Sequence, residues 1–200
     1  MNKAATALLA LVFVVGTAFA AGAQTSNQGT TTTGNQNTPG TTTAPGTQTG
    51  TVQKGNLDKK DMKFLQDTAM DNPFEIQASQ LAAQKANSQE VKDFAQKLVT
   101  DHTRLSSELS SLASTKGVNL SSSMEKKDRK ELDELNKHSG KKFDHEYVKE
   151  MVKNHKEDIR DFKAEAKDAK DPDVKNWASN HVSALEQHLT MAQDLEKKVK

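Results

Sequence analysis

Four side chains that could hold a metal ion fall on the apolar stripes of predicted helices: Glu75, His102, His155 and His188. His102 lies in the segment QKLVTDHTRLSSEL, where leucines recur before and after it at helical spacing. A neutral imidazole binds divalent metals such as zinc, iron or copper, and a carboxylate adds negative charge to such a site. A single histidine on such a stripe is more often a hydrogen-bonded core residue. The metal hypothesis therefore depends on whether the four residues meet.

Their chain positions place the four residues at a common height. Glu75 precedes a predicted turn at Asn87 by 12 residues, and His102 follows that turn by 15. The other two histidines flank a second predicted turn, near Asp171, at distances of 16 and 17 residues. Because a helix rises ~1.5 Å per residue, the members of each pair differ in height by only a few ångströms. We expect four helices to contribute one group each to a central layer.

Other interpretations of these residues stay open. Asp158, three residues after His155, is predicted to orient an imidazole or to join the layer. His181 lies about 10.5 Å along the helix axis from the layer and is predicted to miss it. The run Asn72–Glu75 also has the form of a capping box, in which the glutamate only satisfies a backbone donor. A neutral polar network that fixes helix register is the alternative for the whole set.

The elements that must position these residues are helices, because apolar residues recur every three to four positions from Leu57 onward. Five helical segments are predicted: 64–86 with an interruption or kink at Pro73, 87–117, a short exposed helix ending near Gly140, 143–169, and 171–199. A capping box over Asn87–Glu90 starts the second segment, and Asp171–Pro172 starts the last. This pattern, without strand signals, predicts an all-α fold: an antiparallel four-helix bundle with a short extra helix in the middle connection.

Residues 1–23 are predicted to be a secretory signal peptide. Lys3 gives a positive start, the apolar run ALLALVFVVGTAFA follows, and small-residue cleavage triplets end at Ala20 and Ala23. An uncleaved anchor is the alternative, but a span needs about 20 apolar residues. No cysteine follows the run, which excludes a lipoprotein anchor. We expect an exported protein, periplasmic or associated with the outer membrane or cell surface, with no transmembrane span after cleavage.

Residues 24–56 are predicted to be a disordered linker, and residues 57–200 the bundle domain. No charged residue occurs from Gln24 to Gln53, a stretch rich in Thr, Gly, Gln and Asn. Such a stretch cannot bury enough apolar surface to offset its ordering entropy. It is either a spacer or a neutral leader.

The overall composition excludes several classes of function. The chain has 28 basic and 27 acidic residues, and loss of Lys3 with the signal peptide leaves a formal charge of zero. Such a balance gives no electrostatic attraction to nucleic acid, which we therefore exclude as a partner. With no cysteine, the chain has no disulfides and no thiolate metal ligands.

Three segments carry a family resemblance: FEIQASQLAAQKANSQEVKDFAQKLVTDHT, FDHEYVKEMVKNHKEDIRDF and DPDVKNWASNHVSALEQHLTMAQDL. Together they resemble the bacterial domain-of-unknown-function family numbered 4142, from roughly Asp61 to Leu195. The resemblance implies an exported protein, often labelled an outer-membrane protein, with a ferritin-like four-helix fold. The family's characteristic positions correspond to Glu75, His102, Asp144, Tyr147, His155 and His188.

The ferritin-like resemblance also raises the hypothesis of a di-iron oxidase. Such sites take a Glu-x-x-His pair from each of two helices. The residues three positions before the layer histidines are Val99, Val152 and Leu185, so the bridging carboxylates are missing. We therefore predict that the protein is not an enzyme.

Two functions are consistent with these features of the sequence. The first is an exported, ferritin-like bundle that binds a metal ion or small ligand in a central His/Glu layer. The second is a structural or interaction module of the envelope, with an envelope protein as its partner, whose histidines only set core register. The sequence specifies no oligomeric state.

Overall fold

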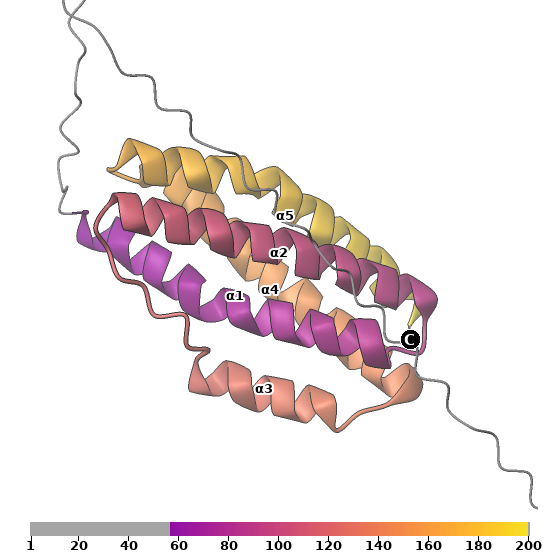
Figure 1. Cartoon of the computed structure of the whole chain (residues 1–200). Coiled ribbons are helices and arrows are strands. Elements are labelled where there is room, and N and C mark those ends of the chain that lie inside the picture. The colour runs from indigo at the N-terminus through magenta and orange to yellow at the C-terminus, as the bar shows by residue number, and fades with distance from the viewer. Residues whose placement is uncertain (1–56, 200) are drawn as a thin grey trace, which may run out of the picture. The chain divides into compact units, whose positions relative to one another are not determined.

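The computed structural model describes residues 57–199, which form α-helices and contain no β-strand. The five helices are α1 (Lys59–Lys85), α2 (Gln89–Thr115), α3 (Lys126–Asn136), α4 (Gly140–Asp168) and α5 (Pro172–Lys198). Four long helices lie side by side, and the short α3 lies outside them (Figure 1). The all-α prediction and the extra helix in the middle connection are confirmed. The predicted signal peptide and linker lie outside the described residues.

The start of α5 follows the predicted capping chemistry. The Asp171 carboxylate accepts hydrogen bonds from the backbone N–H groups of Asp173 and Val174, and Pro172 occupies the first helical turn. The end of α2 also follows prediction, because Gly117 adopts φ of 67°, a left-handed conformation that glycine adopts without strain.

The capping box predicted at the start of α2 is wrong in its chemistry. The helix begins at Gln89 as expected, but the Ser88 side chain makes no capping hydrogen bond. Instead the carboxylate of Asp144, on α4, accepts the backbone N–H groups of Asn87 and Ser88, each at 2.8 Å. The donors at this turn are thus satisfied by a residue more than 50 positions away.

Pro73 does not interrupt the first helix. It lies inside the continuous helix α1, so the alternative that Asn72 caps a new helix is wrong. Asn72 is buried, and its amide donates to the backbone carbonyl of His102 at 3.0 Å. The polar side chain before the proline therefore joins α1 to α2.

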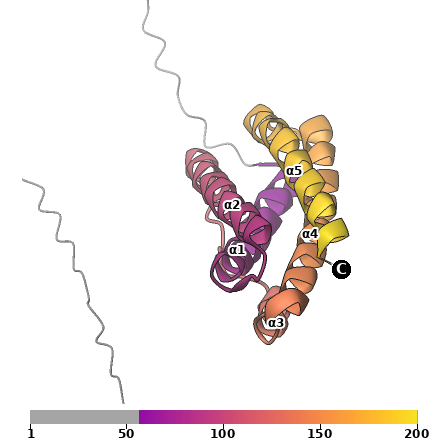
Figure 2. The ribbon, with the colours of Figure 1, turned by 90° about the vertical axis from the view of Figure 1, so that its right-hand side faces the viewer.

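The two long hairpins, α1–α2 and α4–α5, repeat each other at an offset of 83 residues. Matching buried pairs are Asp61 and Asp144, Phe64 and Tyr147, Val91 and Val174, Phe94 and Trp177, and Ala95 and Ala178. The two acids act reciprocally: Asp61 of α1 accepts the backbone N–H groups of Lys170 and Asp171 at the turn of the other hairpin. Figure 2 shows the two hairpins facing each other.

The apolar core is divided into two clusters that flank the level of the histidines. One cluster surrounds the α1–α2 turn and includes Phe94, Phe143 and Tyr147. The other lies near the α4–α5 turn and includes Phe64 and Trp177. A polar layer therefore sits between two apolar blocks, where water is excluded and every unpaired polar atom is costly.

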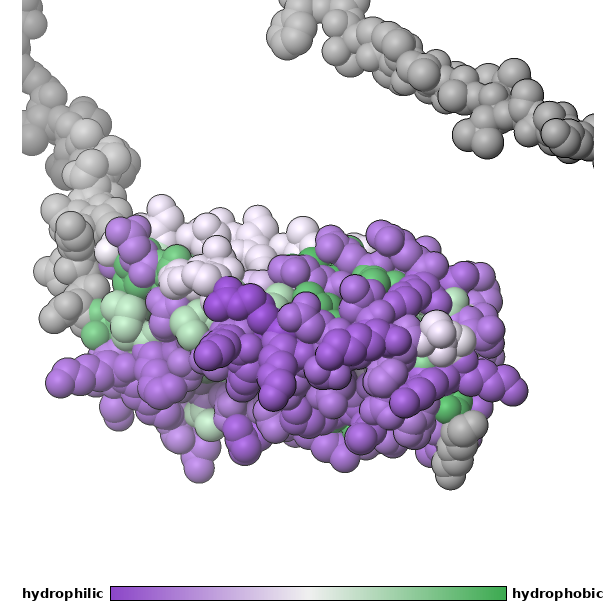
Figure 3. All heavy atoms as spheres, turned by 90° about the horizontal axis from the view of Figure 1, so that it is seen from below, coloured by the Kyte–Doolittle hydropathy of each residue, from purple (hydrophilic) through white to green (hydrophobic). Residues whose placement is uncertain are grey.

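The outer surface of residues 57–199 is polar. Figure 3 shows a face dominated by hydrophilic side chains, and Met191 is the one large apolar side chain that the described part exposes, at 36%. Within this range, no helix combines the length and the apolar character needed to cross a membrane.

Candidate metal centre

The structure brings all four predicted residues into one layer. His102, His155 and His188 come from α2, α4 and α5, and Glu75 comes from α1. The three imidazoles form a nearly equilateral triangle, with ring centroids 5.3–5.6 Å apart. As whole residues, all four are at least 96% buried. The four residues therefore lie at one height along the helices, as their chain positions predict.

Two acceptors on α1 fix the orientation of His102. Its Nδ1 lies 2.7 Å from Oδ1 of Asn72 and 2.9 Å from Oε2 of Glu75. The amide nitrogen of Asn72 donates elsewhere, to the His102 carbonyl, so its oxygen faces the ring. Because both neighbours of Nδ1 are acceptors, Nδ1 carries the hydrogen and Nε2 carries the lone pair.

His155 is oriented by its own helix. Its Nδ1 lies 3.0 Å from the carbonyl oxygen of Met151, one turn earlier, and 3.3 Å from Oε1 of Glu75. Both contacts are acceptors, so Nδ1 again carries the hydrogen and Nε2 the lone pair. Burial lowers the pKa of His155, which keeps its ring neutral at neutral pH.

His188 is oriented from α2. Its Nε2 lies 2.8 Å from Oδ2 of Asp101, which makes Nε2 the donor and leaves the lone pair on Nδ1. Burial outweighs the influence of Asp101 and lowers the pKa of His188 to about 4. This ring too is neutral at neutral pH.

The opposite nitrogens of the three rings are left without partners. His102 Nε2, His155 Nε2 and His188 Nδ1 are buried and have no hydrogen-bond partner among residues 57–199. One ring nitrogen of each histidine lies within 4.8 Å of the others. A buried polar atom without a partner costs about 1–3 kcal/mol. Three such atoms, one from each of three neighbouring rings, could be satisfied by a ligand that accepts lone pairs.

Glu75 gives the layer a fixed negative charge. Burial alone raises the pKa of Glu75, but His102, His155 and His188 outweigh burial and lower it to about 2. Its oxygens contact the Nδ1 atoms of two rings, on the side opposite the lone pairs. Glu75 is therefore placed to orient imidazoles, as the carboxylates behind metal-bound histidines do.

Asp158 lies beside Glu75 rather than beside an imidazole. Burial raises the pKa of Asp158 well above its usual value, and the neighbouring charge of Glu75 adds to the rise. In the 83-residue repeat, Asp158 is the counterpart of Glu75, and His155 is the counterpart of Asn72. The two hairpins thus place equivalent carboxyl groups next to each other.

Two residues of the layer were not predicted as site residues, and His181 is outside it as expected. Asn72 was interpreted as a cap, and Asp101 was not singled out. The 83-residue repeat, which pairs Asn72 with His155, is a signal that could have found the first. His181 instead contacts Glu108 at 3.0 Å and packs against Trp177.

The ligand set fits a transition metal. Zinc bonds imidazole nitrogen at about 2.0–2.1 Å, which separates neighbouring ligand atoms in a tetrahedral site by about 3.3 Å. Nitrogens that lie within 4.8 Å of one another therefore need to approach by no more than about 1.5 Å, which small ring movements supply. From behind, Glu75 contacts the rings of His102 and His155, Met151 contacts His155 through its carbonyl, and Asp101 contacts His188.

The fold and the site together define an all-helical bundle domain with a buried three-histidine cluster. Residues 46–195 match the family described as Domain of unknown function (DUF4142), and the chain belongs to this family. The resemblance found in the sequence is confirmed.

One solved structure with a similar fold is the crystal structure of a DUF305 fragment from Deinococcus radiodurans. The similarity has a TM-score of 0.63 at 12% identity, and it covers 72% of this chain and 99% of that one. At this identity the likeness concerns the fold alone. The comparison with curated proteins gives no match.

Proposed function

We propose that this domain binds one divalent transition-metal ion in its core, through His102, His155 and His188, with Glu75 as the buried counter-charge. The observation that carries the proposal is the arrangement of the ring nitrogens. In each imidazole one nitrogen donates to a fixed acceptor, and the other is buried without a partner. Imidazole ligands favour zinc, copper or iron over magnesium and calcium, which prefer oxygen.

The charges of the layer support a cation. The Glu75 carboxylate is buried, lies 2.9 Å and 3.3 Å from the Nδ1 atoms of His102 and His155, and has a pKa that the three histidines lower to about 2. A buried negative charge of this kind requires compensation. A divalent ion held by the three lone pairs would supply the compensating positive charge. It would lie on the far side of the imidazole rings from Glu75, about one ring away.

Binding without redox turnover suits these residues better than oxidase chemistry. In the proposed ferritin-like, antiparallel four-helix arrangement, a di-iron site would require carboxylates one turn from the histidines. Val99, Val152 and Leu185 occupy those positions. The domain would act as a metal-binding protein of the cell envelope, exported by the predicted signal peptide.

The test is the metal content of the mature protein, expressed with its N-terminal segment and purified without a histidine tag. We expect about one metal ion per chain, lost in His102→Gln and in His155→Gln. His181→Gln is the matched control, because His181 is also buried but lies outside the layer. Added metal at 100 times Kd should stabilise the fold by about 2.7 kcal/mol, which raises Tm by roughly 5–10 °C. Wild-type protein that is metal-free and shows no shift with zinc, copper or iron would overturn the proposal.

A structural role for the histidines is the second candidate, and one observation favours it. The Asn72–His102 contact joins α1 to α2, and the Asp101–His188 contact joins α2 to α5, so both define helix register. If this were their whole role, His188→Gln would change stability without changing metal content.

A further inference from the structure

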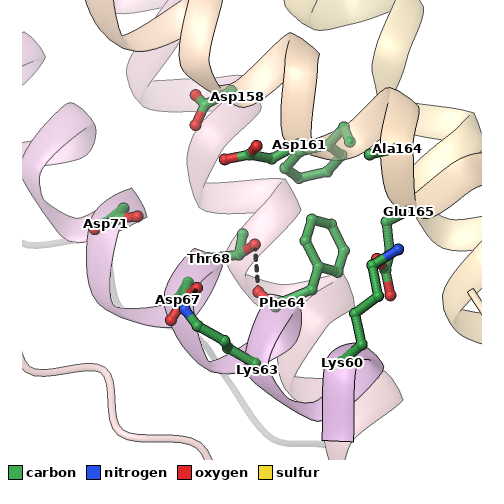
Figure 4. A pocket seen from close by; sticks show the side chains of 11 residues that line it. Lys60, Lys63, Phe64, Asp67, Thr68, Asp71, Asp158, Asp161, Ala164 and Glu165 are labelled. Carbon is green, nitrogen blue, oxygen red and sulfur yellow. Dashed lines mark hydrogen bonds and ion pairs between the residues drawn. The ribbon is translucent and has the colours of Figure 1, made fainter. Parts of the chain in front are cut away.

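An acidic cavity opens between α1 and α4 and leads towards the histidine layer. Its volume is about 300 Å³, and its walls include Asp67 and Asp71 from α1 and Asp158 and Asp161 from α4. Figure 4 shows Asp158 and Asp161 extending from α4 into the space beside the part of α1 that carries Thr68 and Asp71. The carboxyl groups of the two helices thus face one common space.

Two smaller cavities continue this space inward. One of about 60 Å³ and one of about 10 Å³ both share Asp71 and Asp158 with the large cavity. The first also touches Glu75, and the second touches both Glu75 and His102. A volume of about 10 Å³ is at the lower limit for one water molecule. The series therefore ends in a narrow neck against Glu75 and His102, at the edge of the histidine layer.

The outer acids of this channel form ion pairs with basic side chains, and the inner acids do not. Asp67 pairs with Lys63, and Asp161 pairs with Arg160 at 2.8 Å. Among residues 57–199, no ion pair involves Asp71 or Asp158. Neither carboxyl group is held in an ion pair within this range, and burial raises the pKa of both.

The mouth of the channel carries further negative charge from α3. One carboxylate oxygen each of Asp71, Glu125 and Asp128 lie within 4.8 Å of one another. Asp128 is 94% buried, and its Oδ2 has no partner among the described residues. Lys60, Lys63 and Lys127 also line these cavities, but acids outnumber them. A cleft with an excess of one sign of charge concentrates ions of the opposite sign.

The carboxylate behind His188 differs from the two inner acids because it is paired with positive charge. Asp101 lies 2.9 Å from Nζ of Lys97 and 3.9 Å from Nη2 of Arg104. Its charge is therefore already compensated by side chains of its own helix.

We infer that the channel between α1 and α4 is the route by which a divalent cation reaches the histidine centre, with Asp71 as its outer and Asp158 as its inner carboxylate. This inference rests on the proposed function. It adds two residues that touch the metal in transit without holding it at equilibrium. A route residue of this kind changes the association and dissociation rates together and leaves the affinity nearly unchanged.

The test is the rate of zinc uptake by the metal-free mature chain, followed by stopped flow with a chromophoric zinc chelator at low ionic strength. We expect Asp158→Asn and Asp71→Asn each to slow association on the order of tenfold. Dissociation should slow in parallel, so that Kd stays within about threefold. Asp158→Glu keeps the carboxyl group and should keep the wild-type rate. Asp194→Asn, an exposed acid on α5, is the matched control and should leave both rates unchanged.

Each other outcome overturns the inference. Association rates equal to those of the control would show that zinc enters elsewhere. A faster dissociation with unchanged association would make Asp158 a ligand instead of a route residue. Wild-type protein that takes up no zinc at equilibrium would overturn the proposed function as well, whereas rates unaffected by the variants would overturn the route alone.

Discussion

Asp101→Asn tests the hydrogen-bonded support behind the metal centre. The Asp101 carboxylate accepts Nε2–H of His188 at 2.8 Å, and its own side chain is 19% exposed, so the change perturbs little of the core. Asparagine can still accept this hydrogen bond, but it removes the negative charge that makes the imidazole a stronger ligand. Changes to such partners of metal-bound histidines cost 10–100-fold in metal affinity. We expect zinc affinity to fall by that factor, about 1.4–2.7 kcal/mol.

The assay is a competition titration against a chromophoric zinc chelator at fixed pH and salt. Asp101 also pairs with Lys97 at the surface, a contact worth less than about 1 kcal/mol to stability. The metal-free variant should therefore unfold at nearly the wild-type temperature. Asp93→Asn is the control, because Asp93 is an exposed acid of α2 that bonds only to Gln89 in the described part of the chain. If the Asp101→Asn protein bound zinc with an affinity within twofold of that of Asp93→Asn, the assignment of His188 as a ligand would be refuted.

Three further predictions concern the metal-free fold. Burial lowers the pKa of His188 to about 4, against ~6.5 in the unfolded chain. The contribution of this residue to stability is therefore complete above pH 6.5 and is lost as pH falls to 4. The free energy of unfolding in urea should fall by up to about 3 kcal/mol between pH 7 and pH 4.5. Asp144→Asn leaves a backbone N–H at the α1–α2 turn without its charged acceptor. The free energy of unfolding, measured by calorimetry, should fall by about 2 kcal/mol. An unchanged value would contradict the role given to Asp144. Tyr147→Phe removes the hydroxyl that lies 2.9 Å from Ser79 Oγ and should lower the free energy of unfolding by about 1 kcal/mol. Adding Ser79→Ala should restore most of this loss, because no polar group is then left without its partner. A full additive loss in the double mutant would show that the two groups act independently.

Local signals predicted the helices well because their causes are local. The apolar periodicity, the Asp171–Pro172 start and the glycine after Lys116 each act within one or two turns of chain. The start of α2 was placed correctly for the wrong reason. Its donors are satisfied by Asp144 across the bundle, and no local pattern specifies a partner on another helix.

The histidine layer could be predicted because height along a helix follows from residue number. Counting from the two turns placed Glu75 and the three histidines at one level. Their orientation could not be predicted in the same way. Which ring nitrogen faces inward depends on Asn72, Met151 and Asp101, whose contacts follow from side-chain rotamers and helix packing rather than from spacing.

The most direct test of the central claim is the anomalous diffraction of zinc in crystals of the mature domain grown with one equivalent of the metal. We predict one peak in the core, about 2.0–2.1 Å from Nε2 of His102, Nε2 of His155 and Nδ1 of His188. Glu75 and Asp101 should remain on the opposite nitrogens of their rings. A core without anomalous density, or a peak on the opposite nitrogens, would contradict the account.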